Sequence, residues 1–303
     1  MKLGFVGLGK MGGNMVGRLQ QAGHNLVVLD PDANALNRAK AVGATPCNNR
    51  EDLIAELSKT EKRIAVWLMI PAHIVDAELD AFLSLVPKES ILIDGGNSDF
   101  RLTRARAKRC KDRGVSYIDV GTSGGILGKE AGYALMVGGD AKDVQYLSPI
   151  FDTLAPKNGW AYFGESGNGH YTKMVHNAIE YGMMEAYAEG YRMLKDGPAE
   201  GIDLAAAGRV WQNGSIIESL LNRLTKEALE ENPELKGIAG IVAESGETRW
   251  ALEAAKDSGI ELPSIQASFD VRLKSQKGEI NFATKLLAAM RNKFGGHDLN
   301  AKG

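Results

Sequence analysis

The sequence predicts an α/β protein, with an N-terminal Rossmann-like, doubly wound sheet followed by an all-α C-terminal domain. Three observations lead to this expectation. Short apolar strands alternate with amphipathic helices as far as residue 164, which is typical of a mostly parallel sheet. The first strand runs into a glycine-rich loop, and from Gly169 onward only helical patterns remain. We therefore predict two domains, residues 1–164 and 165–303, joined by a long helix.

Composition favours a cytoplasmic protein without a metal. The formal net charge of −2 provides no basic field for nucleic acid or an anionic membrane. No apolar run is long enough to span a membrane, and the N-terminus leads into a strand instead of a signal peptide. Cys47 and Cys110 lie far apart, and the five histidines form no ligand pattern, so we expect neither a disulfide nor a metal site.

The first strand, Lys2–Val6, leads into Gly7-Leu8-Gly9-Lys10-Met11-Gly12, and a helix follows from Asn14. The pattern G-x-G-x-x-G between a strand and a helix is typical of a dinucleotide site. Its glycines admit a pyrophosphate to the backbone, and the helix N–H groups bind the negative charge. A tight turn without a cofactor is the alternative. The positions expected to contact the cofactor are Gly7, Leu8, Gly9, Met11 and Gly12.

Asp30 ends the second predicted strand, Asn25–Leu29, and indicates which dinucleotide binds. A carboxylate can accept hydrogen bonds from the ribose hydroxyls of NAD, but it repels the 2′-phosphate of NADP. The stretch Asp30-Pro31-Asp32 contains no arginine or lysine. We therefore expect NAD, although Asp30 could also be a simple turn residue before Pro31.

Two glycine-rich loops follow strands further along the chain. Strands are expected near residue 45 and at 64–70, 91–94, 116–120 and 133–137, and helices at 33–42, 51–58, 74–85, 101–113 and 144–154. In such sheets, ligands bind beyond the carboxyl ends of the strands. The loops Asp94–Ser98 and Gly121–Gly125 both lie there. Either loop alone could simply be a turn, but two such loops at one edge of the sheet favour a binding site. We expect this site to include Asn97, in contact with both cofactor and substrate, and Ser123.

The helical half is expected to form helices at 169–194, 204–212, 216–226, 248–257 and 264–274, and from 281. In the first of these, Lys173, His176, Asn177 and Glu180 are spaced i, i+3, i+4 and i+7, so they share one face. A core helix does not bury such a row of unpaired polar groups. The alternatives are a catalytic face and a solvated face with a Lys–Glu pair.

These segments resemble one known family. Asp94-Gly95-Gly96-Asn97-Ser98, Ser123-Gly124-Gly125 and Lys173-Met174-Val175-His176-Asn177 with Glu180-Tyr181 are closely similar to 6-phosphogluconate dehydrogenases, in the β-hydroxyacid dehydrogenase superfamily. The segment Arg291–His297 is similar to the substrate-phosphate segment of this family. The resemblance covers nearly the whole chain, and the length matches the short, NAD-dependent form.

The resemblance implies a role for each matching residue. Lys173 would be the general base and Glu180 the general acid. The sugar acid would be held by Asn97, Ser123, Gly124, Gly125, His176 and Asn177, and its phosphate by Tyr181, Arg272, Arg291 and His297. In this family the last two come from a neighbouring subunit, which implies a homodimer or homotetramer. Longer relatives carry Lys-Gly-Thr-Gly-Lys-Trp where this chain has Ser245–Trp250, so we transfer no phosphate contact from that loop.

The implied reaction belongs to the pentose phosphate pathway and to gluconate utilisation. It oxidises the C3 hydroxyl of 6-phosphogluconate with NAD and then releases CO2, forming ribulose 5-phosphate. Lys173 can act as a base only if its pKa lies well below the ~10.4 of free lysine. One alternative is a β-hydroxyacid dehydrogenase for a small unphosphorylated acid, which would lack the Glu180-Tyr181 pair and the Arg291–His297 segment. Another is a non-catalytic NAD-binding sensor, which the presence of Lys173 and Glu180 argues against.

Overall fold

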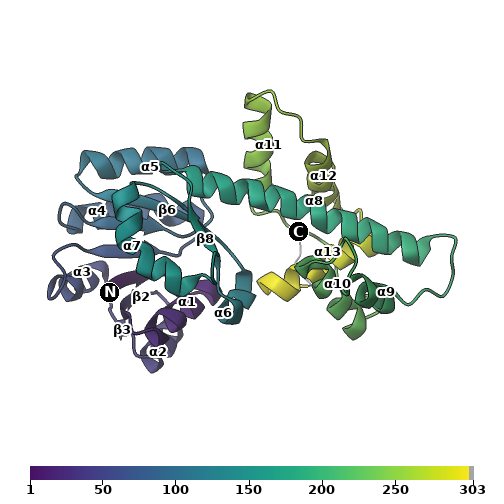
Figure 1. Ribbon diagram of the computed structural model, residues 1–303, viewed down its shortest axis with the longest axis horizontal. Coiled ribbons are helices and arrows are strands. Elements are labelled where there is room, and N and C mark those ends of the chain that lie inside the picture. Colours follow the sequence, from purple (N-terminus) through teal and green to yellow (C-terminus); the bar gives the residue numbers. More distant parts are fainter. Residues whose placement is uncertain (300–303) are drawn as a thin grey trace. The chain divides into compact units, whose positions relative to one another are not determined.

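The computed structural model describes residues 1–299, so residues 300–303, at the end of the second predicted domain, lie outside the description. The chain forms two compact units that meet between Met174 and Val175. Helix α8 (Asn168–Asp196) runs from the first unit into the second (Figure 1). The boundary expected after residue 164 precedes α8, whereas the first turns of this helix pack on the sheet and so belong to the first unit.

The first unit contains one eight-stranded sheet in the order β3-β2-β1-β4-β5-β6-β7-β8. All neighbouring strands are parallel except β6 and β7, which are antiparallel. The strand order reverses between β1 and β4, which is the switch point where ligands bind in doubly wound sheets. The predicted fold class is confirmed. The strands are β1 (Lys2–Val6), β2 (Asn25–Leu29), β3 (Thr45–Pro46), β4 (Ala65–Leu68), β5 (Ile91–Asp94), β6 (Ser116–Ser123), β7 (Ala134–Gly138) and β8 (Trp160–Tyr162).

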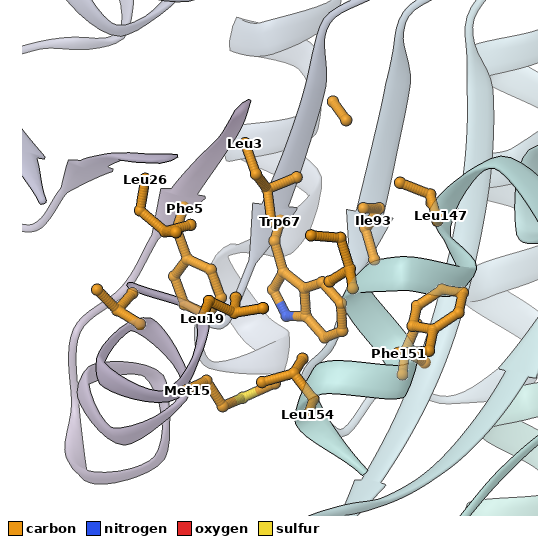
Figure 2. Close-up of a cluster of buried hydrophobic side chains, with 14 of the residues drawn as sticks. Leu3, Phe5, Met15, Leu19, Leu26, Trp67, Ile93, Leu147, Phe151 and Leu154 are labelled. Carbon is orange, nitrogen blue, oxygen red and sulfur yellow. The ribbon is translucent and has the colours of Figure 1, made fainter. Parts of the chain in front are cut away.

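Helices cover both faces of this sheet and bury one hydrophobic core on each side. On one face, Phe5 stacks on Trp67 with their ring centroids 6.0 Å apart, and Phe151 meets Trp67 edge-on (Figure 2). Helices α1, α2 and α7 cover this face, and α3, α4 and α5 cover the other. Their bounds are α1 (Lys10–Gln21), α2 (Ala33–Ala41), α3 (Arg50–Ser58), α4 (Val75–Leu85), α5 (Phe100–Asp112), α6 (Gly128–Ala131) and α7 (Ala141–Leu154).

The described part of the second unit is helical, as the sequence predicts. Its core gathers around Met184, Tyr191, Leu229 and Leu286. Helix α10 begins at Leu220 instead of residue 216, because the Ser219 side chain caps it by accepting the Asn222 N–H. The helices after α8 are α9 (Leu204–Trp211), α10 (Leu220–Glu231), α11 (Glu247–Asp257), α12 (Pro263–Gln276) and α13 (Phe282–Gly295).

Residues 1–299 contain neither a membrane-spanning helix nor a candidate metal cluster. Across this range, every helix is too short or too polar to cross a membrane. Within the same range, three or more His, Cys, Asp or Glu side chains do not come together in a way that could hold a metal ion.

Candidate active site

The glycine-rich loop between β1 and α1 has the shape of a phosphate cradle. A methyl group at Gly7, where φ is +94°, would lie 2.3 Å from the Met69 carbonyl oxygen, and one at Gly12 would lie 2.1 Å from the Gly7 oxygen. A methyl at Gly9 would meet nothing within 4 Å, and Gly9 caps α1 without any side chain. There is therefore open space beside Gly9 at the start of α1, which suits the pyrophosphate of a dinucleotide.

Side chains around this loop support it. Leu8 is buried and Met11 is half-buried, so Leu8 offers a ligand only its backbone. The Asp30 carboxylate accepts the Leu8 N–H at 2.5 Å and the Asp32 N–H at 2.8 Å. It therefore ties the end of β2 to the glycine loop. Each carboxylate oxygen has a second lone pair, so Asp30 remains able to accept a ribose hydroxyl.

The loop after β5 is fixed by a buried network that the sequence did not predict. Asp94 accepts hydrogen bonds from the Gly96 N–H at 3.1 Å, the Ser98 hydroxyl at 2.7 Å and the Tyr117 hydroxyl at 2.9 Å. Arg106, on α5, donates to the Ser98 oxygen at 2.9 Å and is only 1% exposed. Asn97 is exposed on the loop that this network holds. Only one feature of the sequence indicated that Arg106 belongs to this network. It shares a face of α5 with Thr103 and Cys110, which are both buried.

The loop after β6 exposes its backbone. Ser123, the last residue of β6, pairs with Ala134 in the antiparallel ladder and is half-buried. Gly124 and Gly125 have φ values of +128° and +53°, which side chains other than glycine rarely adopt. Gly124 is exposed and Gly125 is half-buried beside the half-buried Ser123.

The start of α8 lies directly on β6 and β7. The Asp119 carboxylate accepts the Gly167 N–H at 2.8 Å and the His170 N–H at 2.9 Å, and so compensates the positive end of the helix. A methyl at Gly169 would lie 2.4 Å from the Met136 oxygen, so only glycine permits this approach. Lys173 is 6% exposed, and its Cβ lies against Gly121. The structure thus brings Lys173 to the Gly121–Gly125 loop. Asp119 was not predicted from the sequence, in which its only signal is a carboxylate within an apolar strand.

Further along α8, in the second unit, a polar row continues. Asn177 is buried, whereas the His176 and Glu180 side chains are 41% and 24% exposed. The Asn177 Oδ1 lies 2.9 Å from His176 Nδ1, which is 3.8 Å from a Glu180 oxygen. The Asn177 amide nitrogen donates to Glu247 at 2.8 Å. These residues share one face of a continuous helix with Lys173, as their spacing predicts.

Two buried arginines lie next to Tyr181. The guanidinium carbon of Arg272 is 3.2 Å from the centre of the Tyr181 ring, and Arg272 is 1% exposed. Burial lowers the pKa of Arg272 to about 10, and it also lowers the pKa of Arg291. Neither guanidinium forms a salt bridge within residues 1–299, and Nη1 of Arg272 has no hydrogen-bond partner there. Buried, unpaired guanidinium groups favour an anion, and arginine binds phosphate in a bidentate manner.

Arg291 and His297, which the family resemblance places at a neighbouring subunit's site, differ in their surroundings. Arg291 lies in the chain's own α13, where Tyr181, Glu180 and Glu247 of the same chain raise its pKa against the effect of burial. His297 is exposed beyond α13, with its ring against Gly295.

The glycine cradle at Gly9 on a doubly wound sheet is that of a dinucleotide-binding α/β protein. Two family models match the chain. One, described as the NAD binding domain of 6-phosphogluconate dehydrogenase, covers residues 2–164, and the other, the 6-phosphogluconate dehydrogenase C-terminal domain, covers residues 169–285. The chain belongs to the 6-phosphogluconate dehydrogenase family.

Individual relatives agree with this assignment. The chain is 38% identical over 305 residues to the NAD(+)-dependent, decarboxylating 6-phosphogluconate dehydrogenase of Haloferax volcanii, covering 100% of this chain and 99% of the relative. The solved 6-phosphogluconate dehydrogenase of Plasmodium falciparum is 26% identical, with a TM-score of 0.81 over 96% of this chain and 70% of that one. A Mycobacterium tuberculosis 3-hydroxyisobutyrate dehydrogenase, 21% identical, shares the fold with a TM-score of 0.72 over 94% and 97% of the two chains.

Proposed function

We propose that this protein oxidises and decarboxylates 6-phosphogluconate, producing ribulose 5-phosphate and CO2 with NAD as the oxidant. The observation that carries the proposal is the buried, unpaired Arg272 on the ring of Tyr181, with Arg291 nearby. A dehydrogenase for a small unphosphorylated acid has no need to bury two guanidinium groups that form no salt bridge. Such burial is costly even though Glu180, Glu185 and Glu247 act on their charges. The 38% identical relative from Haloferax volcanii, a 6-phosphogluconate dehydrogenase, also supports this substrate.

The proposal assigns proton transfer to the chain's own residues. Bound NAD supplies the hydride acceptor. Neutral Lys173 takes the proton of the C3 hydroxyl as that carbon loses its hydride, and the lysine, now protonated, donates a hydrogen bond to the new carbonyl oxygen. That oxygen accepts the electrons of the carbon–carbon bond when CO2 leaves. Glu180 then donates a proton to the enediol carbon that becomes C1 of the product. The i, i+7 spacing of Lys173 and Glu180 supports base and acid acting at successive carbons.

The remaining predicted residues would hold the sugar acid. Asn97, Ser123, Gly124 and Gly125 offer amide, hydroxyl and backbone groups on loops that buried hydrogen bonds and glycine conformations keep in place. His176 and Asn177 would bind hydroxyl groups from α8. Tyr181, Arg272 and Arg291 would hold the phosphate.

Assembly is part of the same proposal. Apolar side chains of the second unit are exposed around α9 and the start of α10, among them Val210 at 66% and Ile216 at 103%. Exposed apolar groups of this kind favour an interface. We propose at least a homodimer in the cytoplasm, in which Arg291 and His297 reach a neighbouring subunit's phosphate site. Analytical ultracentrifugation would test this, and a monomer at micromolar concentration would contradict it.

The decisive experiment measures NADH formation with 6-phosphogluconate, gluconate and 3-hydroxyisobutyrate, while CO2 is trapped in parallel. We expect turnover with 6-phosphogluconate alone, with one CO2 released per NADH. Lys173→Ala should lower this rate ~10²–10⁴-fold with little change in NAD affinity. Turnover of the small acid without CO2 would assign the protein to the wider hydroxyacid dehydrogenases. NAD binding without turnover of any substrate would indicate a sensor.

A further inference from the structure

Glu247 is a buried carboxylate for which the proposed mechanism has no role. It is the first residue of α11, in the Ser245–Trp250 segment that departs from the family pattern, and it is 2% exposed. Its Oε1 accepts the Asn177 amide N–H at 2.8 Å, whereas Oε2 has no hydrogen-bond partner within residues 1–299. Burying a carboxylate with one oxygen unbonded is costly, so this arrangement requires an explanation.

The contact between Glu247 and Asn177 fixes which way the amide of Asn177 faces. The amide nitrogen of Asn177 is the donor to the Glu247 carboxyl oxygen, so this nitrogen faces Glu247. The amide oxygen is then the atom 2.9 Å from His176 Nδ1. Because an amide oxygen only accepts, His176 Nδ1 must carry a proton. In neutral His176, Nε2 is then the acceptor nitrogen.

We propose that Glu247 is a positioning residue that orients the Asn177 amide and thereby holds neutral His176 in the tautomer with the proton on Nδ1. The consequence for the reaction, which rests on the proposed function, is that His176 Nε2 can accept a hydrogen bond from a hydroxyl group of the sugar acid. Glu247, Asn177 and His176 would thus form one chain of hydrogen bonds, in which Glu247 orients Asn177 and Asn177 orients His176.

The loop around Glu247 is itself held in place, as a positioning role requires. The Gly246 N–H donates to Glu244 at 2.7 Å, and Arg249 forms a salt bridge with the same Glu244 side chain. The Ser245 N–H lies 3.4 Å from the Tyr181 hydroxyl oxygen. A methyl at Gly246, where φ is +101°, would lie 2.7 Å from the Trp250 ring. Glu247 therefore accepts the Asn177 hydrogen bond from a segment whose own contacts hold it in place.

The first test is nitrogen-15 NMR of the histidine rings of the intact protein above pH 8, with the His176 signal assigned from a His176→Gln variant. We expect the Nδ1-protonated tautomer in the wild-type protein, and the Nε2-protonated tautomer would overturn the proposal. Since this measurement needs no turnover, it is independent of the substrate. If 6-phosphogluconate is not oxidised while His176 holds the Nδ1 proton, only the proposed function fails.

The second test compares two substitutions. Glu247→Gln keeps an acceptor for Asn177, so we expect the tautomer to persist and the KM for 6-phosphogluconate to stay within about threefold. Glu247→Leu removes the acceptor, so we expect mixed tautomers and a KM that rises about 10–100-fold, with the KM for NAD unchanged. Asp257→Asn, an exposed change at the end of the same helix, is the control and should resemble wild type. Equal losses in the Gln and Leu variants would overturn the proposal, because the charge of Glu247 and not its acceptor would then matter.

Discussion

The Cβ of Lys173 packs against the backbone of Gly121, so closely that a methyl group on Gly121 would lie 2.3 Å from it. The same methyl would lie 2.9 Å from the Gly169 carbonyl oxygen. Neither neighbour is the flexible end of a side chain, so the helix itself would have to move. Gly121 therefore determines how close Lys173 lies to the Ser123 loop.

Gly121→Ala should accordingly displace the start of α8 and lower kcat/KM for 6-phosphogluconate by ~10²-fold, the typical effect of a 1 Å misplacement. The Kd for NAD should change little, because the cradle at Gly9 is on another loop. Gly17→Ala is the matched control: a methyl there meets nothing within 4 Å in α1, so activity should be retained. Normal turnover by Gly121→Ala would show that the close packing does not position Lys173.

Cofactor preference should depend on Asp30. The double substitution Asp30→Ser with Pro31→Arg replaces a repelling carboxylate by groups that can bind a 2′-phosphate, so the ratio of kcat/KM for NADP to that for NAD should rise. Because Asp30 also accepts the Leu8 N–H, we expect NAD affinity to fall as well. Asp30→Asn is the control, since it keeps an acceptor for Leu8. An unchanged ratio in the double variant would place the discrimination elsewhere.

Arg272→Lys should separate phosphate binding from chemistry. Lysine retains the charge but cannot stack flat on Tyr181 or bind phosphate with two parallel hydrogen bonds. We expect the KM for 6-phosphogluconate to rise about 10–100-fold, the equivalent of one charge-assisted hydrogen bond, with kcat less affected. Arg209→Lys, an exposed change on α9, should leave both constants at wild-type values. A wild-type KM in Arg272→Lys would argue against this phosphate site.

Glu185 should make the folded state less stable as pH rises through neutrality. Burial, assisted by Glu189 and opposed by Arg272, raises its pKa from 4.5 to about 7. Between these values the folded state binds more protons than the unfolded state. The free energy of unfolding therefore decreases with increasing pH and becomes constant about one pH unit above 7. The loss amounts to up to ~3 kcal/mol, at 1.36 kcal/mol per pKa unit.

Urea unfolding at several values of pH would measure this effect. Glu185→Gln should remove the decrease between pH 5 and 8 that the wild-type protein shows, to about the extent given above. Glu261→Gln, at an exposed position, should leave the decrease intact. The same pH dependence in wild type and Glu185→Gln would exclude Glu185 as its source.

Much of the first unit could be predicted because each strand or helix shows its own repeat of buried apolar residues within a short segment of sequence. Strand β5 begins and ends at the residues expected from its apolar run, and α8 is the single long helix that its pattern predicts. The sequence analysis did not predict β8, whose residues are mostly exposed, nor the antiparallel pairing of β6 with β7. Strand direction depends on where the chain returns to the sheet, which a run of apolar residues does not indicate.

The sequence by itself determined the groups whose geometry is set within a few residues. The glycine loop, Asp30 and the row from Lys173 to Glu180 follow from a turn, a strand end and a helical repeat. Only the tertiary structure decided the contacts that join residues far apart in the chain. These are the hydrogen bond from the His170 N–H to Asp119, the contact of Arg272 with the Tyr181 ring, and the hydrogen bond from Asn177 to Glu247. These contacts depend on which segments are packed together, and burial gives them their strength, because a charge removed from water responds strongly to its few neighbours.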